Sequence, residues 1–221
     1  MKAIIFGATG MVGQSVLREC LLDPGVSMVR TIGRTATGTQ HLKLRETVQT
    51  NLWDFSNIED DMKGFDACFF CLGVTSTGMS EQDYTRVTYG ITMAAAETLS
   101  RLNPEMTFVF ISAAGTDSSE RGRLMWARVK GKTENALLRL PFHAAYMFRI
   151  AAVEPMHGIK SRTRSYRIGY LVLKPILPLL RWMFPGYVLT TEELGRAMLE
   201  VARRGAPKKV LESRDIAAVL R

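Results

Sequence analysis

The 221-residue sequence contains few cysteines, and none of them suggests a disulfide framework. The three cysteines, Cys20, Cys68 and Cys71, are typical of a protein in a reducing compartment. Cys68 and Cys71 have the C-x-x-C spacing of redox and zinc sites, but they lie in a run typical of a buried strand. Residues three apart in a strand point to opposite faces. We therefore expect neither a redox pair nor a metal site.

A leader peptide and an uninterrupted membrane span are also missing from the pattern. Met1-Lys2 leads directly into the apolar run 3–6, so we expect no signal peptide and a cytoplasmic location. The most apolar stretch, 168–189, is interrupted by Lys174, Arg181 and three prolines. We expect it to form an amphipathic piece packed over the substrate cleft. Peripheral contact with an anionic membrane is the alternative, because basic residues flank the apolar ones.

The net charge of +8 is unevenly distributed along the chain. The whole excess lies in residues 156–221, which hold 13 Lys or Arg against 5 Asp or Glu. Such a segment can face a phosphorylated ligand, a lipid or a nucleic acid, or it can be a solvated basic surface. We expect no nucleic-acid partner, because no recognition motif accompanies these charges. The length favours one domain, 1–221, in which residues 156–221 form the lobe over the substrate.

What is present is a glycine-rich turn, Gly7–Gly13, between the apolar run 3–6 and a helical pattern. Gly7 would allow a tight turn, Gly10 a close approach to a pyrophosphate, and Gly13 close packing of helix on strand. The phosphates would bind the free N–H groups at the helix start. This pattern predicts an α/β, Rossmann-type doubly wound parallel sheet with a small C-terminal helical lobe. The expected cofactor contacts here are Gly7, Thr9, Gly10, Met11, Val12 and Gly13.

Residues 28–34 are expected to form the second strand with its terminal loop. This loop offers Arg34 where an acidic residue would bind a ribose 2′-hydroxyl. A cation suits a 2′-phosphate, so the sequence favours NADP, with NAD and a plain surface arginine as alternatives. A third strand is expected at 47–52.

A continuous apolar run, 65–73, is typical of a central parallel strand. Because ligands bind at the carboxyl ends of such strands, we expect Leu72 and Gly73 along the cofactor. The following hydroxyl-rich residues would face the substrate, namely Thr75, Ser76 and Thr77. A capped long helix should follow from Ser80 to Leu102, and a strand at 106–111 should then deliver Ser112 to the same cleft.

The G-x-x-G-x-x-G spacing resembles the extended or atypical branch of the short-chain dehydrogenase/reductase superfamily, the NAD(P)-dependent epimerase/dehydratase-like proteins. The segment Val129-Lys130-Gly131 with Glu134 is similar to the group that contains the mammalian Tat-interacting protein. The resemblance implies that Asp54 and Phe55 contact the adenine and that the segment around Val153 anchors the nicotinamide. For Asp54, a turn or cap role is the alternative. By the same analogy, a homodimer is a further expectation.

The resemblance also implies a catalytic serine, tyrosine and lysine, of which Ser112 and Lys130 are present. Trp126 stands at the tyrosine position, and an indole cannot act as a general acid or base. Another proton donor would be needed, and the candidates are Tyr84, Tyr89, Ser76, Thr77 and His157. The expected function is an NADP(H)-binding oxidoreductase-like protein with a small-molecule substrate. The alternative is a catalytically idle NADP(H)-binding regulatory or sensor module that acts through a protein partner.

Overall fold

The computed structural model describes residues 1–159 and 186–221 of the chain. Its main strands are β1 (Lys2–Phe6), β2 (Met28–Gly33), β3 (Leu44–Val48), β4 (Ala67–Phe70), β5 (Thr107–Ala113), β6 (Ala144–Ile150) and β9 (Val210–Glu212). Two short strands, β7 (Ala152–Glu154) and β8 (Val188–Thr190), pair with each other. The helices are α1 (Met11–Leu22), η1 (Ser56–Met62), α2 (Glu81–Thr85), η2 (Arg86–Gly90), α3 (Ile91–Leu102), α4 (Met125–Leu137), α7 (Thr191–Arg204) and α8 (Ser213–Ala218).

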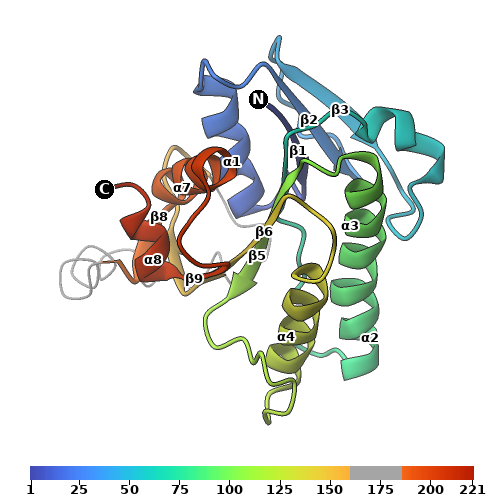
Figure 1. Ribbon diagram of the computed structural model, residues 1–221, viewed down its shortest axis with the longest axis vertical. Helices are drawn as coiled ribbons and strands as arrows, with labels where there is room; N and C mark the ends of the chain where they lie inside the picture. Colours follow the sequence, from blue (N-terminus) through green and yellow to red (C-terminus); the bar gives the residue numbers. More distant parts are fainter. Residues whose placement is uncertain (160–185) are drawn as a thin grey trace.

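In the described part of the chain, seven parallel strands form one sheet in the order β3-β2-β1-β4-β5-β6-β9 (Figure 1). The two central strands β1 and β4 are buried on both faces, and residues 3–6 and 67–70 are all buried. Burial on both faces explains why these strands are continuous apolar runs rather than alternating ones. The predicted Rossmann-type doubly wound fold is therefore confirmed.

Helices cover the two faces of the sheet in separate layers (Figure 1). One apolar layer joins α1 and α7 to the sheet, and the other joins α3 and the end of α4 to it. Helices α1 and α7 pack closely because Gly195 lies on the backbone of Ser15, where a Cβ would be 3.0 Å from the Ser15 carbonyl oxygen. The Ser15 hydroxyl also donates to the Thr191 carbonyl oxygen. Two segments far apart in the sequence thus support each other.

The cap predicted from sequence at Ser80 is confirmed, and a second helix begins with a capping box. The Ser80 hydroxyl accepts the Asp83 N–H at the start of α2, and Thr190 and Glu193 form a capping box at the start of α7. The helix expected from Ser80 to Leu102 is present, but a π-helical turn, η2, lies between α2 and α3. The last of these helices, α3, has Asn103 as its C-cap. The Asn103 side chain donates to the Met62 carbonyl oxygen and accepts the Phe65 N–H.

The third strand was expected at 47–52, but it lies three residues earlier, at β3. Gln49 explains the difference. Its N–H donates to the Gly33 carbonyl oxygen, whereas its side-chain amide bonds the Asp54 carbonyl oxygen and Asn57. These side-chain bonds turn the chain away from the sheet where the strand was expected to continue.

Residues 160–185 lie outside the described part of the chain. They include most of the apolar stretch 168–189, with Lys174 and Arg181, and the basic residues that precede this stretch. Among the helices that are described, none is long and apolar enough to cross a membrane.

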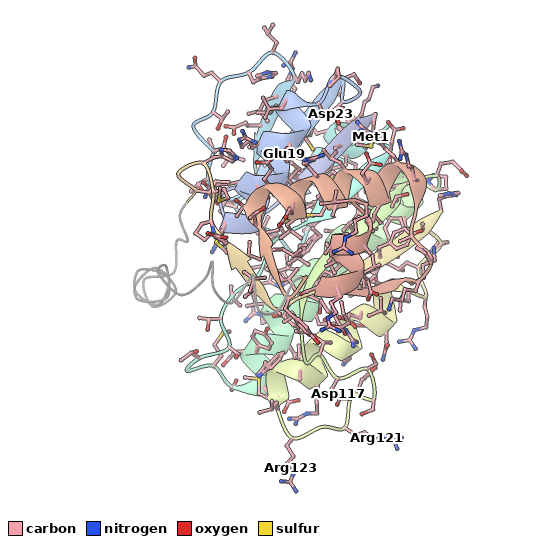
Figure 2. The ribbon with its side chains drawn as sticks, turned by 90° about the vertical axis from the view of Figure 1, so that its left-hand side faces the viewer. Met1, Glu19, Asp23, Asp117, Arg121 and Arg123 are labelled. Carbon is pink, nitrogen blue, oxygen red and sulfur yellow. The ribbon has the colours of Figure 1, made fainter. Side chains whose placement is uncertain are left out.

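The loop between β5 and α4 lies at the opposite end of the molecule from Met1 (Figure 2). The Asp117 carboxylate organises it by accepting the Ser119 hydroxyl and the N–H groups of Gly122, Ser119 and Arg121, which together lower its pKa to about 2. Gly131 lets α4 approach this loop, since a Cβ there would be 1.8 Å from the Asp117 carbonyl oxygen.

A buried ion pair joins this region to the sheet. Glu134 on α4 is fully buried, and both of its carboxylate oxygens accept bonds from Arg149 on β6, at 3.1 and 3.2 Å from Nε. Arg149 also contacts Glu212 of β9 and the hydroxyl of Ser118. One guanidinium therefore fastens α4, β6, β9 and the loop together.

We predict that Arg149→Met destabilises the fold by about 3–5 kcal/mol, because it leaves a buried carboxylate unpaired. The double variant Arg149→Met with Glu134→Leu should recover much of that loss, since no buried charge remains. Urea unfolding of the two variants and the wild type measures both values. A single substitution that costs less than about 1 kcal/mol would contradict the assignment.

Candidate functional site

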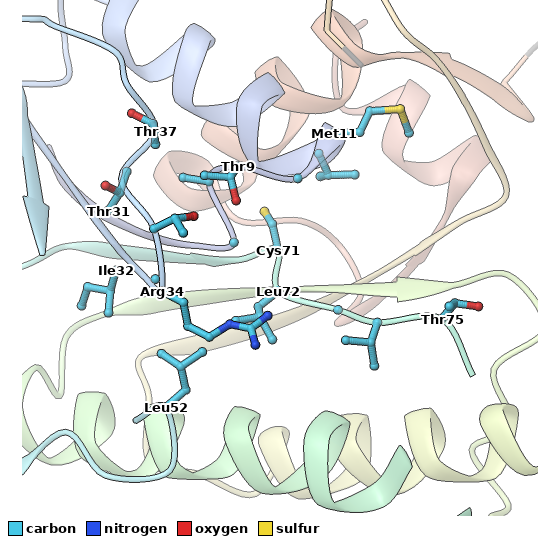
Figure 3. A pocket seen from close by; sticks show the side chains of 18 residues that line it. Thr9, Met11, Thr31, Ile32, Arg34, Thr37, Leu52, Cys71, Leu72 and Thr75 are labelled. Carbon is cyan, nitrogen blue, oxygen red and sulfur yellow. The ribbon is translucent and has the colours of Figure 1, made fainter. Parts of the chain in front are cut away.

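The candidate site lies where the strand order reverses, between β1 and β4. A cavity of about 670 Å³ opens there at the carboxyl ends of β1, β2 and β4 (Figure 3). This is the position at which open parallel sheets bind ligands, and the volume lies within the usual range for small-molecule pockets.

The glycine turn forms one wall of the cavity and depends on two missing Cβ atoms. Gly7 has φ +74°, and a Cβ on it would lie 2.7 Å from the Leu72 amide nitrogen. A Cβ on Gly13 would lie 2.1 Å from the Gly7 carbonyl oxygen, so Gly13 serves the packing of α1 and does not line the cavity. Gly10 is the N-cap of α1 and supplies no side-chain bond. The first N–H groups of α1, at Met11 and Val12, therefore start at the cavity wall, as an anion site requires.

The end of β2 forms the opposite wall. Ile32, Gly33, Arg34, Thr35 and Thr37 line it, and Arg34 extends into the space beside Leu52 and Leu72 (Figure 3). Arg34 is the one charged side chain among the described lining residues, and none of them is Asp or Glu. The described wall thus offers no carboxylate for a ribose hydroxyl and one cation for a phosphate.

The structure places half of the predicted site residues at this cavity. Those that line it are Gly7, Thr9, Gly10, Met11, Val12, Arg34, Leu72, Gly73 and Thr75. Ser76 and Thr77 do not appear among the described lining residues, although the Thr77 hydroxyl lies 3.0 Å from that of Thr75.

Two residues assigned to the adenine by resemblance lie elsewhere. Phe55 is buried in the core, with its ring edge-on to Phe6 at 5.7 Å. The Asp54 carboxylate accepts the Ser56 N–H, which makes it a turn residue. Leu52 lines the cavity where this pair was expected. The described lining of the cavity does not include this pair, because the segment after β3 turns away from the sheet earlier than the pattern indicated.

Val153 lies in the smaller, two-stranded sheet. It lies in β7, pairs with β8 and is buried in the core beside α7. Its side chain is not among the described lining residues of the cavity.

Several lining residues were missed, namely Ala8, Thr31, Ile32, Gly33, Thr35, Thr37, Leu52, Cys71 and Val74. Most of them could have been found from one signal, because they lie at the carboxyl ends of neighbouring parallel strands. Cys71 lies at the cavity whereas Cys68 is buried against the opposite layer, as the strand geometry predicted. Burial raises the pKa of the Cys71 thiol, so this sulfur is held in its unreactive protonated form.

A second group of predicted residues lies on β5 and α4. Ser112 is 2% exposed, and its hydroxyl lies 3.0 Å from that of Thr116. The Thr116 hydroxyl donates to the Ala113 carbonyl oxygen at 2.7 Å. Because that proton is already used, the bond between the two hydroxyls has Ser112 as its donor. In this arrangement, the Ser112 proton points into the protein.

Lys130 extends from α4 toward β5. Its Nζ lies 3.5 Å from the Ile111 carbonyl oxygen and 5.4 Å from the centre of the Phe110 ring. Burial lowers the pKa of this ammonium to about 8, although the carboxylate of Glu134 opposes the shift. Trp126 is half-buried and packs over Gly115, where a Cβ would lie 3.6 Å from its ring.

The other candidate proton donors have contacts of their own. Tyr84 is buried, the Tyr89 ring lies under Lys132 at 4.8 Å, and His157 lies 2.8 Å from the Glu192 carboxylate. None of the three is among the described residues that line the cavity.

Comparison with known proteins agrees with this geometry. A family model described as NAD(P)H-binding matches residues 7–139. The protein FMP52-2, mitochondrial, of Scheffersomyces stipitis is 29% identical over 214 residues, which cover 95% of this chain and 90% of that protein. The protein HTATIP2 of Rattus norvegicus is 28% identical over 151 residues, 67% of this chain and 61% of that protein.

Solved structures share the fold. The Bordetella bronchiseptica enzyme WbmF, in complex with NAD+, superposes with a TM-score of 0.69 at 15% identity, covering 98% of this chain and 76% of that one. A short-chain dehydrogenase family protein from Francisella tularensis gives a TM-score of 0.67 at 13% identity, with 98% of both chains covered.

The cytoplasmic location expected from the sequence is wrong. Relatives from several fungi, aligned over most of this chain, are named mitochondrial.

We predict that Lys130→Met stabilises the protein at neutral pH, by up to about 3 kcal/mol. The native pKa of Lys130, about 8, lies below the ordinary value of 10.5. Between these values the unfolded chain holds the proton and the native state does not, so wild-type stability rises with pH across this window. Below pH 8 the full penalty for the buried charge is present. Methionine removes that penalty, and its advantage should therefore shrink from pH 8 upward. Denaturant unfolding at pH 7 and pH 9.5 measures the difference, and an equal effect at both values would refute the buried charge.

Proposed function

Because the chain belongs to the NAD(P)H-binding family and has the fold of the short-chain dehydrogenases, we propose that it is an NADP(H)-binding oxidoreductase-like protein of the atypical class. Its substrate would be a small molecule. The observation that carries the preference for NADP(H) is the described cavity wall, which has Arg34 and no carboxylate.

The residues present fit a dinucleotide phosphate. Gly10 carries no side chain beside the cavity, and the start of α1, which is held in place by the packing of Gly13 on Gly7, supplies N–H groups for the pyrophosphate. Arg34 would hold the adenosine 2′-phosphate with a planar, bidentate donor pair, and the hydroxyl of Thr35 would add a further donor. Leu52, Leu72 and Ile32 would provide apolar contacts with the adenosine.

When bound, the reduced cofactor would supply a hydride to a substrate carbonyl or an equivalent group. Of Ser112, Trp126 and Lys130, only Lys130 titrates near neutral pH. We assign Lys130 the role of holding a proton near the reacting end of the site, with Ser112 as a hydrogen-bonding group if its hydroxyl rotates away from Thr116. Thr75, and after it Ser76 and Thr77, would face the substrate.

A second candidate function rests on a specific observation. Trp126 has no transferable proton, and the Ser112 proton is directed to Thr116. Both features favour a catalytically idle module that binds NADP(H) and signals through a protein partner. Two further proposals are compatible with either function. One is contact with an anionic membrane through the basic C-terminal segment, and the other is pairing into a homodimer.

We predict that Arg34→Glu weakens NADPH binding by about 100-fold and leaves NADH binding unchanged, because it removes a charge-assisted phosphate bond and adds repulsion. Gly10→Val should abolish binding of both, since its side chain would occupy the pyrophosphate space. Calorimetric titration measures each affinity. The matched control is Arg123→Glu, because Arg123 is exposed and points away from the molecule at its far end (Figure 2). Equal losses in Arg34→Glu and Arg123→Glu would remove the case for a 2′-phosphate site.

A second prediction separates the two functions. If the protein is an enzyme with a donor other than tyrosine, Trp126→Tyr should not raise the rate of NADPH oxidation with a panel of aldehydes, ketones and quinones. The tyrosine would have no place in its proton transfer. The decrease in NADPH absorbance measures the rate. An increase of tenfold or more would favour the idle module, in which the missing acid is the defect.

A further inference from the structure

The loop that carries Arg34 needs an anchor. Residues 34–43 connect β2 to β3 without helix or strand, and Arg34, Thr35 and Thr37 from this loop line the cavity. Gly38 in its middle has φ +77°, and the side chains around it are largely exposed. Such a connection is mobile unless something fixes it, and an unfixed loop would lose conformational freedom when a ligand binds.

One carboxylate provides that anchor. Oε1 of Glu46 accepts the N–H of Thr37 at 2.9 Å and also the Thr37 hydroxyl. The Thr37 hydroxyl in turn accepts the N–H of Thr39 at 3.1 Å. Within the part of the chain that the structure describes, no other hydrogen bond joins residues 34–40 to the rest of the protein.

The anchor is built on the sheet beside the cavity. Glu46 lies in β3, directly opposite Thr31 of β2, and Thr31 is itself a cavity residue. The contact thus runs from the edge strand to the middle of the loop, three residues after Arg34. Thr37 is only half-exposed, unlike the residues on either side of it, which agrees with a fixed point in an otherwise open segment.

We propose that Glu46 is a positioning residue for the adenosine end of the cofactor, and this inference rests on the proposed function. By holding Thr37, Glu46 keeps the segment 34–37 in the form that presents Arg34 and Thr35 to a 2′-phosphate. The residue determines specificity without touching the ligand, because the segment it fixes is the one that distinguishes NADP(H) from NAD(H).

The direction of the change in ligand affinity distinguishes a positioning role of Glu46 from a simple electrostatic effect. A carboxylate near a phosphate site opposes the binding of an anion, so removing its charge should tighten binding if Coulomb repulsion were its whole influence. A positioning role has the opposite sign, since the loop then has to be ordered by the ligand. Glutamine keeps the acceptor oxygen and loses the charge, whereas alanine loses both.

The test uses the full chain and two fragments of the cofactor. Calorimetry measures the affinity for adenosine 2′,5′-bisphosphate and for nicotinamide mononucleotide in wild type, Glu46→Ala, Glu46→Gln and Thr37→Val. The control is Glu105→Ala, which also removes one negative charge but at a side chain that is 92% exposed and remote from the cavity lining. Thermal melting verifies that each variant is folded, and Thr37→Val tests the same anchor from its other side.

We expect Glu46→Ala to weaken the bisphosphate by about tenfold, the cost of ordering one or two more groups on binding. Nicotinamide mononucleotide should bind all variants equally, Glu46→Gln should stay within twofold of wild type, and Thr37→Val should show a smaller loss. Unchanged or tighter bisphosphate binding in Glu46→Ala, with the wild type binding well, overturns the positioning role alone. A wild type that binds neither the bisphosphate nor NADPH overturns the proposed NADP(H) function, and the inference with it.

Discussion

The close backbone contact between Gly7 and Gly13 is the constraint on which the rest of the site depends. It places the start of α1 directly at the carboxyl ends of β1 and β4, so unpaired N–H groups meet the cavity. The sheet can supply this edge because its two central strands are buried on both faces and are held rigid by two helical layers. Backbone geometry, rather than any one side chain, therefore creates this end of the site.

Three carboxylates near the functional residues accept hydrogen bonds from neighbouring segments. Glu134 gives both oxygens to Arg149, Asp117 receives three N–H groups of its own loop, and Glu46 receives two donors from Thr37. Each carboxylate organises a segment of chain and is hydrogen-bonded where it lies. This arrangement leaves Arg34 without a carboxylate among the described lining residues of the cavity, which suits an anionic ligand.

The sequence predicted what short-range patterns encode. The glycine turn, the buried central strands and the cap at Ser80 depend on neighbouring residues, and all are found where expected. Asp54, Phe55 and Val153 were assigned by analogy of position. The segment of Asp54 and Phe55 depends on the side-chain bonds of Gln49, and Val153 on the pairing of β7 with β8, neither of which a local pattern shows. The Ser112–Thr116 bond and the contact of Glu46 with Thr37 could likewise not be predicted from sequence, because each depends on the path of a loop.

The packing of α7 on α1 has a consequence for how the molecule folds. The Ser15–Thr191 bond joins residues 176 positions apart, so the outer side of α1 is covered only when the distant segment docks. Contacts of such high sequence separation form late and require closure of a long loop. Amide hydrogen exchange in the first turns of α1 should therefore follow the local opening of α7, and the two helices behave as one cooperative unit.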